Sequence, residues 1–158
     1  MMGTDGRFVR VVLRLAQAEA VADQSPSIEA EHMLLALTAP QGGRARDLLA
    51  EAGLDHDAVR IALAADVERS LALVGVRLAA GRMPRSSSLP GRKPRLGASA
   101  RWVLHRAVAA ARGGPENRIE PRHVLVGLLN ARVGSVPRAL DLAGVDRPAL
   151  IARALASP

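Results

Sequence analysis

Cysteine is absent from this chain of 158 residues, and aromatic side chains are nearly absent, with one Phe, one Trp and no Tyr. The lack of cysteine excludes disulfides, thiolate metal sites and cysteine nucleophiles, and it fits a reducing cytosol. With so few aromatic residues, the core has to be built from Leu, Val, Ile and Ala. That composition favours helices over sheets.

Long apolar runs are missing as well. No segment approaches the ~18 consecutive apolar residues that a membrane span needs. The apolar stretch near the N-terminus is interrupted by Arg14 and Glu19, and no small-residue cleavage site follows it. We therefore expect a soluble, cytoplasmic protein without membrane contact.

Acidic residues are missing from one segment, between Glu68 and Glu116, which holds ten basic residues. The rest of the chain carries 12 basic and 15 acidic residues, a net charge of −3, so the overall charge of +7 arises in the middle. Phosphate binding by this segment would be steeply salt dependent, but it lacks the interleaved aromatics that stack on bases. We expect a solvated loop first, a contact for an acidic protein second, and nucleic-acid binding as the weaker alternative.

Catalytic motifs are also lacking. There is no G-x-S-x-G elbow, and Ser86 to Ser88 have no base placed beside them. There is no G-x-x-x-x-G-K-[ST] phosphate loop either, which excludes ATP hydrolysis by that route. We predict a protein that is not an enzyme and needs no cofactor or metal.

What the sequence does contain is an internal repeat. At an offset of 91 residues and without gaps, 17 of 57 positions are identical between residues 7–63 and 98–154. The clearest match is Ile28-Glu29-Ala30-Glu31-His32-Met33-Leu34 with Ile119-Glu120-Pro121-Arg122-His123-Val124-Leu125. A repeat is the sequence signature of a duplicated structural unit. We therefore predict an all-α fold in which two pseudo-symmetric four-helix repeats form one compact domain over residues 1–158.

Each copy predicts four short helices. The first covers about residues 7–23, and its apolar stripe recurs in the second copy; the two stripes are Val9, Leu13, Ala16 and Ala20, and Ala100, Leu104, Ala107 and Ala111. The second helix is expected to start near Ala30 or Pro121, and its buried residues would be Leu34, Leu37, Leu125 and Leu128.

Glycine and aspartate mark the remaining boundaries. Gly53 and Gly144 are expected to close the third helices. Asp55 and Asp146 are expected to cap the fourth helices, with Val59 and Leu150 as their apolar contacts.

The two copies are joined by a segment outside the repeat. Repeat one is placed at about 7–66, a basic linker at about 67–97, and repeat two at about 98–156. Within the linker, residues 69–76 are interpreted as an extra short helix closed by Gly75. Residues 81–97 are rich in Pro, Ser and basic residues, which is typical of a mobile connection.

The paired Ile-x-x-Glu-His-x-Leu-Leu-x-Leu type block, followed each time by an Ala-Gly-[Leu/Val]-Asp turn, resembles the N-terminal repeat domain of Clp protein unfoldases. The likeness covers about residues 7–156. It implies a receptor domain for substrates and adaptors of the Clp protease machine, here free-standing: an adaptor, competitor or decoy. In some members such domains bind phosphoarginine, and cyclic-peptide antibiotics dock on them. Sequestration of such antibiotics is therefore a further alternative.

The resemblance also implies site residues. Glu31, in the first turn of the second helix, matches a position that contacts the guanidinium of phosphoarginine. The alternative is a carboxylate without a binding role, whose charge the helix dipole favours at this place. The second copy has Arg122 there, so one site is expected rather than two.

Two helix faces form the other implied site. Arg10, Arg14 and Gln17 on the first helix, with Arg101 and His105 on its repeat, match a groove at the pseudo-two-fold axis. Arg14 and His105 depart from the family pattern. An ordinary solvated face is the alternative.

His32 and His123 repeat at equivalent positions. A metal or acid–base role is possible in principle, but no Cys, paired Asp or HExxH spacing accompanies them. We expect half-buried histidines that bond a backbone carbonyl. Trp102, whose repeat mate is Val11, is predicted to pack in the core, with a surface contact for a partner as the alternative.

Overall fold

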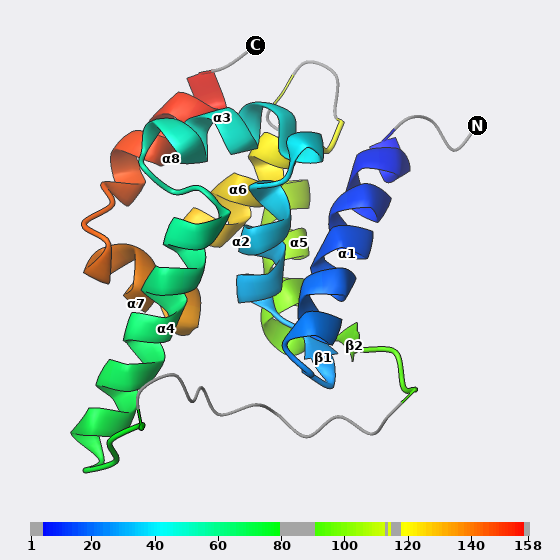
Figure 1. The fold of residues 1–158 in the computed structure, drawn as a ribbon. Coiled ribbons are helices and arrows are strands. Elements are labelled where there is room, and N and C mark those ends of the chain that lie inside the picture. Colours follow the sequence, from blue (N-terminus) through cyan, green and yellow to red (C-terminus); the bar gives the residue numbers. More distant parts are fainter. Residues whose placement is uncertain (1–4, 80–90, 113, 115–117, 157–158) are drawn as a thin grey trace.

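The computed structural model describes residues 5–79, 91–112, 114 and 118–156, and these form eight α-helices (Figure 1). Their bounds in the first repeat are α1 Asp5–Ala22, α2 Ala30–Leu37, α3 Gly43–Glu51 and α4 His56–Leu73. Those in the second repeat are α5 Ala98–Ala111, α6 Pro121–Leu129, α7 Ser135–Leu142 and α8 Arg147–Ala156. A short 3-10 helix, Pro40–Gly42, precedes α3.

The predicted all-α, two-repeat fold is confirmed. Helices α2 and α6 begin at Ala30 and Pro121, and α4 and α8 begin at His56 and Arg147, so both pairs keep the offset seen in the sequence. The only strands among the described residues are β1, Ser27–Ile28, and β2, Arg95–Leu96, which pair in parallel. This pairing brings the start of α2 beside the start of α5.

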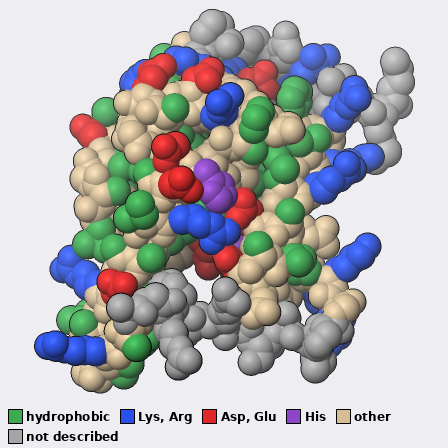
Figure 2. Space-filling view, viewed as in Figure 1, with side chains coloured by type: hydrophobic (Ala, Val, Ile, Leu, Met, Phe, Trp, Pro, Cys, Tyr) green, Lys and Arg blue, Asp and Glu red, His purple; other side chains and the backbone are tan. Residues whose placement is uncertain are grey.

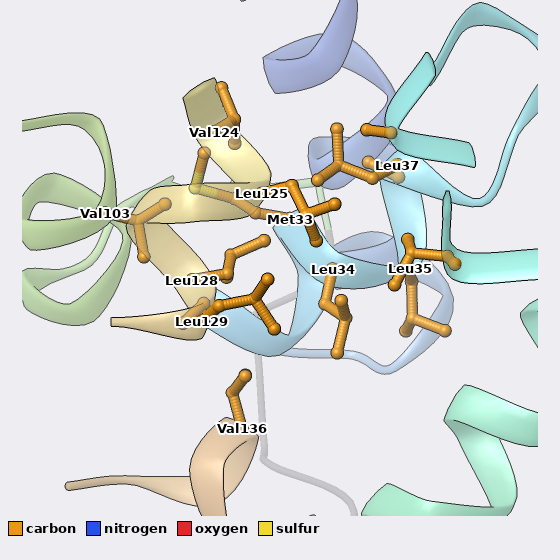
Figure 3. Packing of buried hydrophobic residues seen from close by; sticks show 14 of the residues in the cluster. Met33, Leu34, Leu35, Leu37, Val103, Val124, Leu125, Leu128, Leu129 and Val136 are labelled. Atoms are coloured by element: carbon orange, nitrogen blue, oxygen red, sulfur yellow. The ribbon is translucent and has the colours of Figure 1, made fainter. Parts of the chain in front are cut away.

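Helices α2 and α6 supply the centre of the core, because almost every side chain along them is buried. Figure 3 shows Met33, Leu34, Leu35 and Leu37 of α2 meeting side chains of α6 and its neighbours. The four predicted leucines, Leu34, Leu37, Leu125 and Leu128, are all fully buried. The outer helices bury one stripe each, as amphipathic helices do.

The predicted helix boundaries are confirmed by their local chemistry. Gly53 and Gly144 adopt left-handed φ angles of 74° and 70°, which an L side chain would resist. Asp55 accepts a hydrogen bond from the Ala58 N–H at 2.8 Å, and Asp146 accepts the equivalent bond from Ala149 at 3.0 Å. The same turn chemistry thus starts the fourth helix of both repeats.

The predicted extra helix at 69–76 is wrong. Residues 69–73 continue α4, which runs unbroken to Leu73 because no glycine or proline interrupts it before Gly75, at φ 78°. Asp66 in this longer α4 is buried, and Arg138 of α7 binds both of its oxygens, at 2.8 and 3.1 Å. The extension therefore ties the first repeat to the second.

The segment predicted as a linker is structured at both ends. Its first residues belong to α4, and Arg95–Leu96 form β2. Residues 80–90, which hold most of the predicted mobile connection, lie outside the described residues.

Candidate functional site at the start of helix α2

A reciprocal capping arrangement fixes the start of α2. The Glu29 N–H donates to Nδ1 of His32 at 2.9 Å, while the Glu29 side chain accepts from the backbone N–H of His32. His32 is only 3% exposed. The expectation of a half-buried histidine bonded to a carbonyl is therefore wrong: the ring is buried and accepts from an N–H. Because Nδ1 is the acceptor, Nε2 carries the proton and faces Asp23 Oδ2 at 3.4 Å.

Glu29 also joins α2 to α5. Its carboxylate accepts from the Ser99 hydroxyl and from the Ser27 hydroxyl, the latter at 2.7 Å. The Ser99 oxygen in turn accepts from the Ala30 N–H at 2.8 Å. A Cβ at Gly97 would lie 1.9 Å from a Glu29 oxygen, so the close approach depends on glycine there. These contacts hold the starts of α2 and α5 in a fixed relation.

A cavity of about 390 Å³ opens beside this junction. It lies between the start of α2, one side of α5, and residues 131–137, which connect α6 to α7 and begin α7; we call it the α2–α5 cavity. The residues that line it include Glu31, Trp102, Arg106, Arg132, Val133 and Ser135. Apolar walls with a few polar groups are typical of ligand sites.

Glu31 is the carboxylate of this cavity that the junction does not use. The Ser135 hydroxyl donates to Glu31 Oε2 at 2.9 Å, across 104 residues of sequence. That bond orients the half-buried carboxylate, and no hydrogen bond or ion pair from another described residue occupies Oε1. A carboxylate held by one oxygen can accept a hydrogen bond from a guanidinium or ammonium group of a ligand.

Trp102 forms a wall of the same cavity and is 61% exposed. Its prediction as a core residue is wrong, because it lies about 100° around α5 from the buried stripe that includes Val103 and Ala107. The Arg106 guanidinium carbon lies 5.9 Å from the centroid of the Trp102 ring. The His105 ring lies edge-on to the Trp102 ring, with 6.1 Å between the two ring centroids. A surface position is the alternative that the sequence left open, and contact with a partner there stays a prediction.

The second repeat conserves the cap but changes the charge. The Glu120 N–H donates to Nδ1 of His123 at 3.0 Å, as in the first repeat. Arg122 stands at the position of Glu31, and its Nε donates to Glu120 Oε2 at 2.7 Å. Burial, and then the charge of Arg122, lowers the pKa of His123. The carboxylate that could receive a cation exists only in the first repeat.

The residues of the predicted groove lie elsewhere. Arg10 and Arg14 are exposed on α1, where Gln17 is half-buried, and Arg101 and His105 are exposed on α5. None of these five lines the α2–α5 cavity. Their role in a groove between α1 and α5 stays a prediction.

Sequence reasoning missed several residues of the cavity. Ser135 and Arg132 reach it only through the packing of α7 against the first repeat, and no local pattern signals that contact. Arg106 was visible only as a basic residue. Trp102 comes one position before Val103 of the buried stripe, and this was the one sequence signal that could have predicted its exposure.

No three His, Cys, Asp or Glu side chains gather to hold a metal ion in the part of the chain that the structure describes. Across those residues, no helix combines the length and apolarity needed to cross a bilayer.

Comparison with known proteins gives a family and a fold. The family model of the Clp repeat N-terminal domain matches residues 7–114. Among solved structures, the N-terminal domain of the chaperone ClpD from Arabidopsis thaliana is similar with a TM-score of 0.62 and 24% identity, over 94% of this chain and 92% of that one. A structure from preliminary investigations of a malarial protein secretion system is similar with a TM-score of 0.61 and 19% identity, over 94% of this chain and 89% of that one. No curated protein matches by sequence.

Proposed function

Because the chain belongs to the Clp N-terminal repeat domain family, we propose that it receives substrate or adaptor segments of a Clp machine in the α2–α5 cavity. Clp N-terminal domains are protein-interaction modules that bind substrates and adaptors and are not themselves catalytic. In this role the protein acts as an adaptor or decoy that modulates Clp-dependent degradation. The observation that carries the proposal is the oriented carboxylate of Glu31 inside a cavity walled by an exposed tryptophan.

The lining of the cavity favours a ligand that carries both charges. Glu31 can accept from a guanidinium group, while Arg106 and Arg132 line the same space and favour an anionic group. Phosphoarginine in a peptide combines a guanidinium with a phosphoryl group. The apolar surfaces of Trp102 and Val133 can pack against the peptide side chains next to it.

Titration of a phosphoarginine peptide tests the proposal. Trp102 is the only tryptophan, so its emission reports on the cavity directly, and calorimetry supplies the stoichiometry. We expect saturation at one site per chain. Glu31→Gln should weaken binding at least about tenfold, because a charge-assisted hydrogen bond becomes a neutral one. Glu68→Gln, an exposed glutamate on α4, is the matched control and should bind as the wild type does.

The outcomes separate the coarse proposal from the fine one. If neither phosphoarginine nor its peptide binds but a Clp substrate peptide shifts the Trp102 emission, the phosphoryl ligand is wrong and the receptor role stands. If Glu31→Gln and Glu68→Gln behave alike with every peptide, the cavity is not the binding site.

A further inference from the structure

Helix α4 is longer than its counterpart in the second repeat. At the offset of 91 residues, α8 matches only residues 56–65, whereas α4 continues to Leu73 and its C-cap Val74. Residues 66–74 have no counterpart among the described residues of α8, and we call them the α4 extension. Figure 1 shows this end of α4 projecting past α7.

The buried stripe of α4 continues into the extension and loses its cover there. Val59, Ala62 and Asp66 of the stripe are buried against the rest of the fold. Leu73 follows Asp66 by seven residues, which places it two turns further along the same face. Yet Leu73 is 82% exposed, and Val74 beside it is 73% exposed. This face of the helix therefore has the sequence of a packed surface without a packing partner.

The helix end that carries these side chains is closed by a regular motif. The Val76 N–H donates to the Leu71 carbonyl oxygen at 2.9 Å, and the Gly75 N–H donates to that of Ala72 at 3.1 Å. Gly75 supplies the left-handed φ of 78° that this Schellman closure requires. The exposed apolar side chains thus stand on a formed helical surface.

The α4 extension is amphipathic. Viewed down the helix axis, its apolar side chains and Ser70 fall within an arc of about 160°; they are Leu73, Val74, Val67 and Leu71. Glu68 lies just beyond one edge of this arc, and Arg69 just beyond the other. Both are exposed, and neither forms a hydrogen bond or ion pair with another described residue. The third charged residue, Asp66, is bound by Arg138.

The charges at the two edges indicate what covers the arc. An exposed apolar surface of this kind marks a contact with another protein. In Figure 2, hydrophobic and charged side chains lie together at the lower left, where Figure 1 places the end of α4. When two copies of the extension lie side by side in the same direction, Glu68 of each copy faces Arg69 of the other, as flanking charges do in parallel coiled coils.

The rest of the surface disfavours self-association, because each chain carries a net charge of +7. The extension is the place where a second copy meets an apolar face with balanced charges. We propose that the chain forms a two-fold symmetric homodimer through the α4 extension, in which the two apolar arcs pack together and Glu68 and Arg69 form two equivalent ion pairs. No residue of the extension lines the α2–α5 cavity, so the dimer carries two accessible cavities.

Sedimentation equilibrium over a range of protein concentrations tests the dimer. The mass of the wild type should rise from 16.6 kDa towards twice that value as the concentration increases. Leu73→Gln combined with Val74→Gln should weaken the association at least about tenfold, because the centre of the contact is lost. The control combines Ile61→Gln and Leu155→Gln, which are exposed apolar positions outside the arc, and should associate as the wild type does. Circular dichroism confirms that each variant folds.

Charge reversal tests the pairing of the two edges. Glu68→Arg and Arg69→Glu each replace two ion pairs by two like-charge contacts, so each should weaken the association about fivefold or more. The two substitutions change the net charge in opposite directions, so a general charge effect cannot explain a loss in both. The variant that combines them restores both pairs in reverse and should regain most of the affinity.

Three results would overturn the proposal. A wild type that stays monomeric at its highest soluble concentration would leave the arc to a helix of another protein. Equal losses in the apolar variant and its control would move the contact to another face. A combined charge variant that associates no better than the single ones would refute the pairing of Glu68 with Arg69.

Discussion

His32 and His123 show how a residue type can mislead until its hydrogen bonds are known. Their exact repetition suggests chemistry, yet each ring closes a capping box by accepting a backbone N–H through Nδ1. That role requires the neutral ring, because a protonated Nδ1 cannot accept. The sequence placed both histidines correctly at the second helix of each repeat. It could not identify their partner, since the bond depends on the ring orientation at the helix start.

The neutral cap predicts how stability depends on pH. Burial lowers the pKa of folded His123 below the ordinary value of about 6.5 that applies when the chain is unfolded. Below that value the unfolded state binds the proton first, so the free energy of unfolding falls as the pH drops towards the pKa of the folded state. Denaturant titrations between about pH 7.5 and 5 should show this loss.

A matched variant isolates the contribution of His123. His123→Gln removes the titrating ring, and its pH profile over the same range should be flatter than that of the wild type. His105→Gln, an exposed position on α5, should leave the profile unchanged. An equally steep profile in all three proteins would mean that other groups control the acid sensitivity.

At the scale of the helices, the two repeats are alike in boundaries but differ in how closely they pack. The caps, the closing glycines and the start of each second helix were predictable because they depend on local chemistry. The distance between packed helices was not predictable, because it depends on side chains that face each other across the core. A Cβ at Gly127 of α6 would lie 2.5 Å from the Val103 carbonyl oxygen of α5, while its repeat mate is Ala36.

Gly127→Ala should therefore destabilise the protein, although alanine is normally the better helix former. The added methyl group forces α5 and α6 apart, which should cost about 1–3 kcal/mol. Gly6→Ala in α1 is the control, since its Cβ would meet only the end of the Arg10 side chain at 3.8 Å. That change should be neutral or slightly stabilising. Thermal and denaturant unfolding measure both, and equal effects would contradict the close packing of α5 on α6.

At the scale of the molecule, the repeats interlock. Helix α4 packs on α7, and α3 packs on both α6 and α8, so each repeat buries apolar surface against the other. The sequence predicted the duplication but not this exchange of contacts, which no periodicity encodes. For the same reason the sequence could not predict the contact of Ser135 with Glu31, which exists only because α7 packs on the first repeat.

The ion pair between Asp66 and Arg138 offers a test of the contact between the two repeats. Asp66 is buried, and its hydrogen bond raises the pKa of the Arg138 guanidinium. Arg138→Ala leaves the carboxylate without its partner, which should cost about 1–3 kcal/mol, and Asp66→Asn in the same chain should recover part of that loss. Arg69→Ala, exposed on α4, is the control.

The number of unfolding transitions should show whether the loss of stability affects both repeats together. We expect a single transition in all variants, because the packing of α4 on α7 and of α3 on α6 and α8 still joins the repeats when the ion pair is lost. Two separate transitions in Arg138→Ala would mean that the repeats are stable apart.

The interlocked packing also has a consequence for a single repeat. A lone repeat would expose the apolar face of its second helix, which here is covered by the other copy. Such a repeat would need a second copy of itself to cover that face, as a symmetric homodimer provides, whereas this chain supplies the cover within one polypeptide. The two halves of one polypeptide need not have the same sequence. The first carries an acidic side chain, Glu31, beside its cavity, while the second carries Arg122 at the corresponding position.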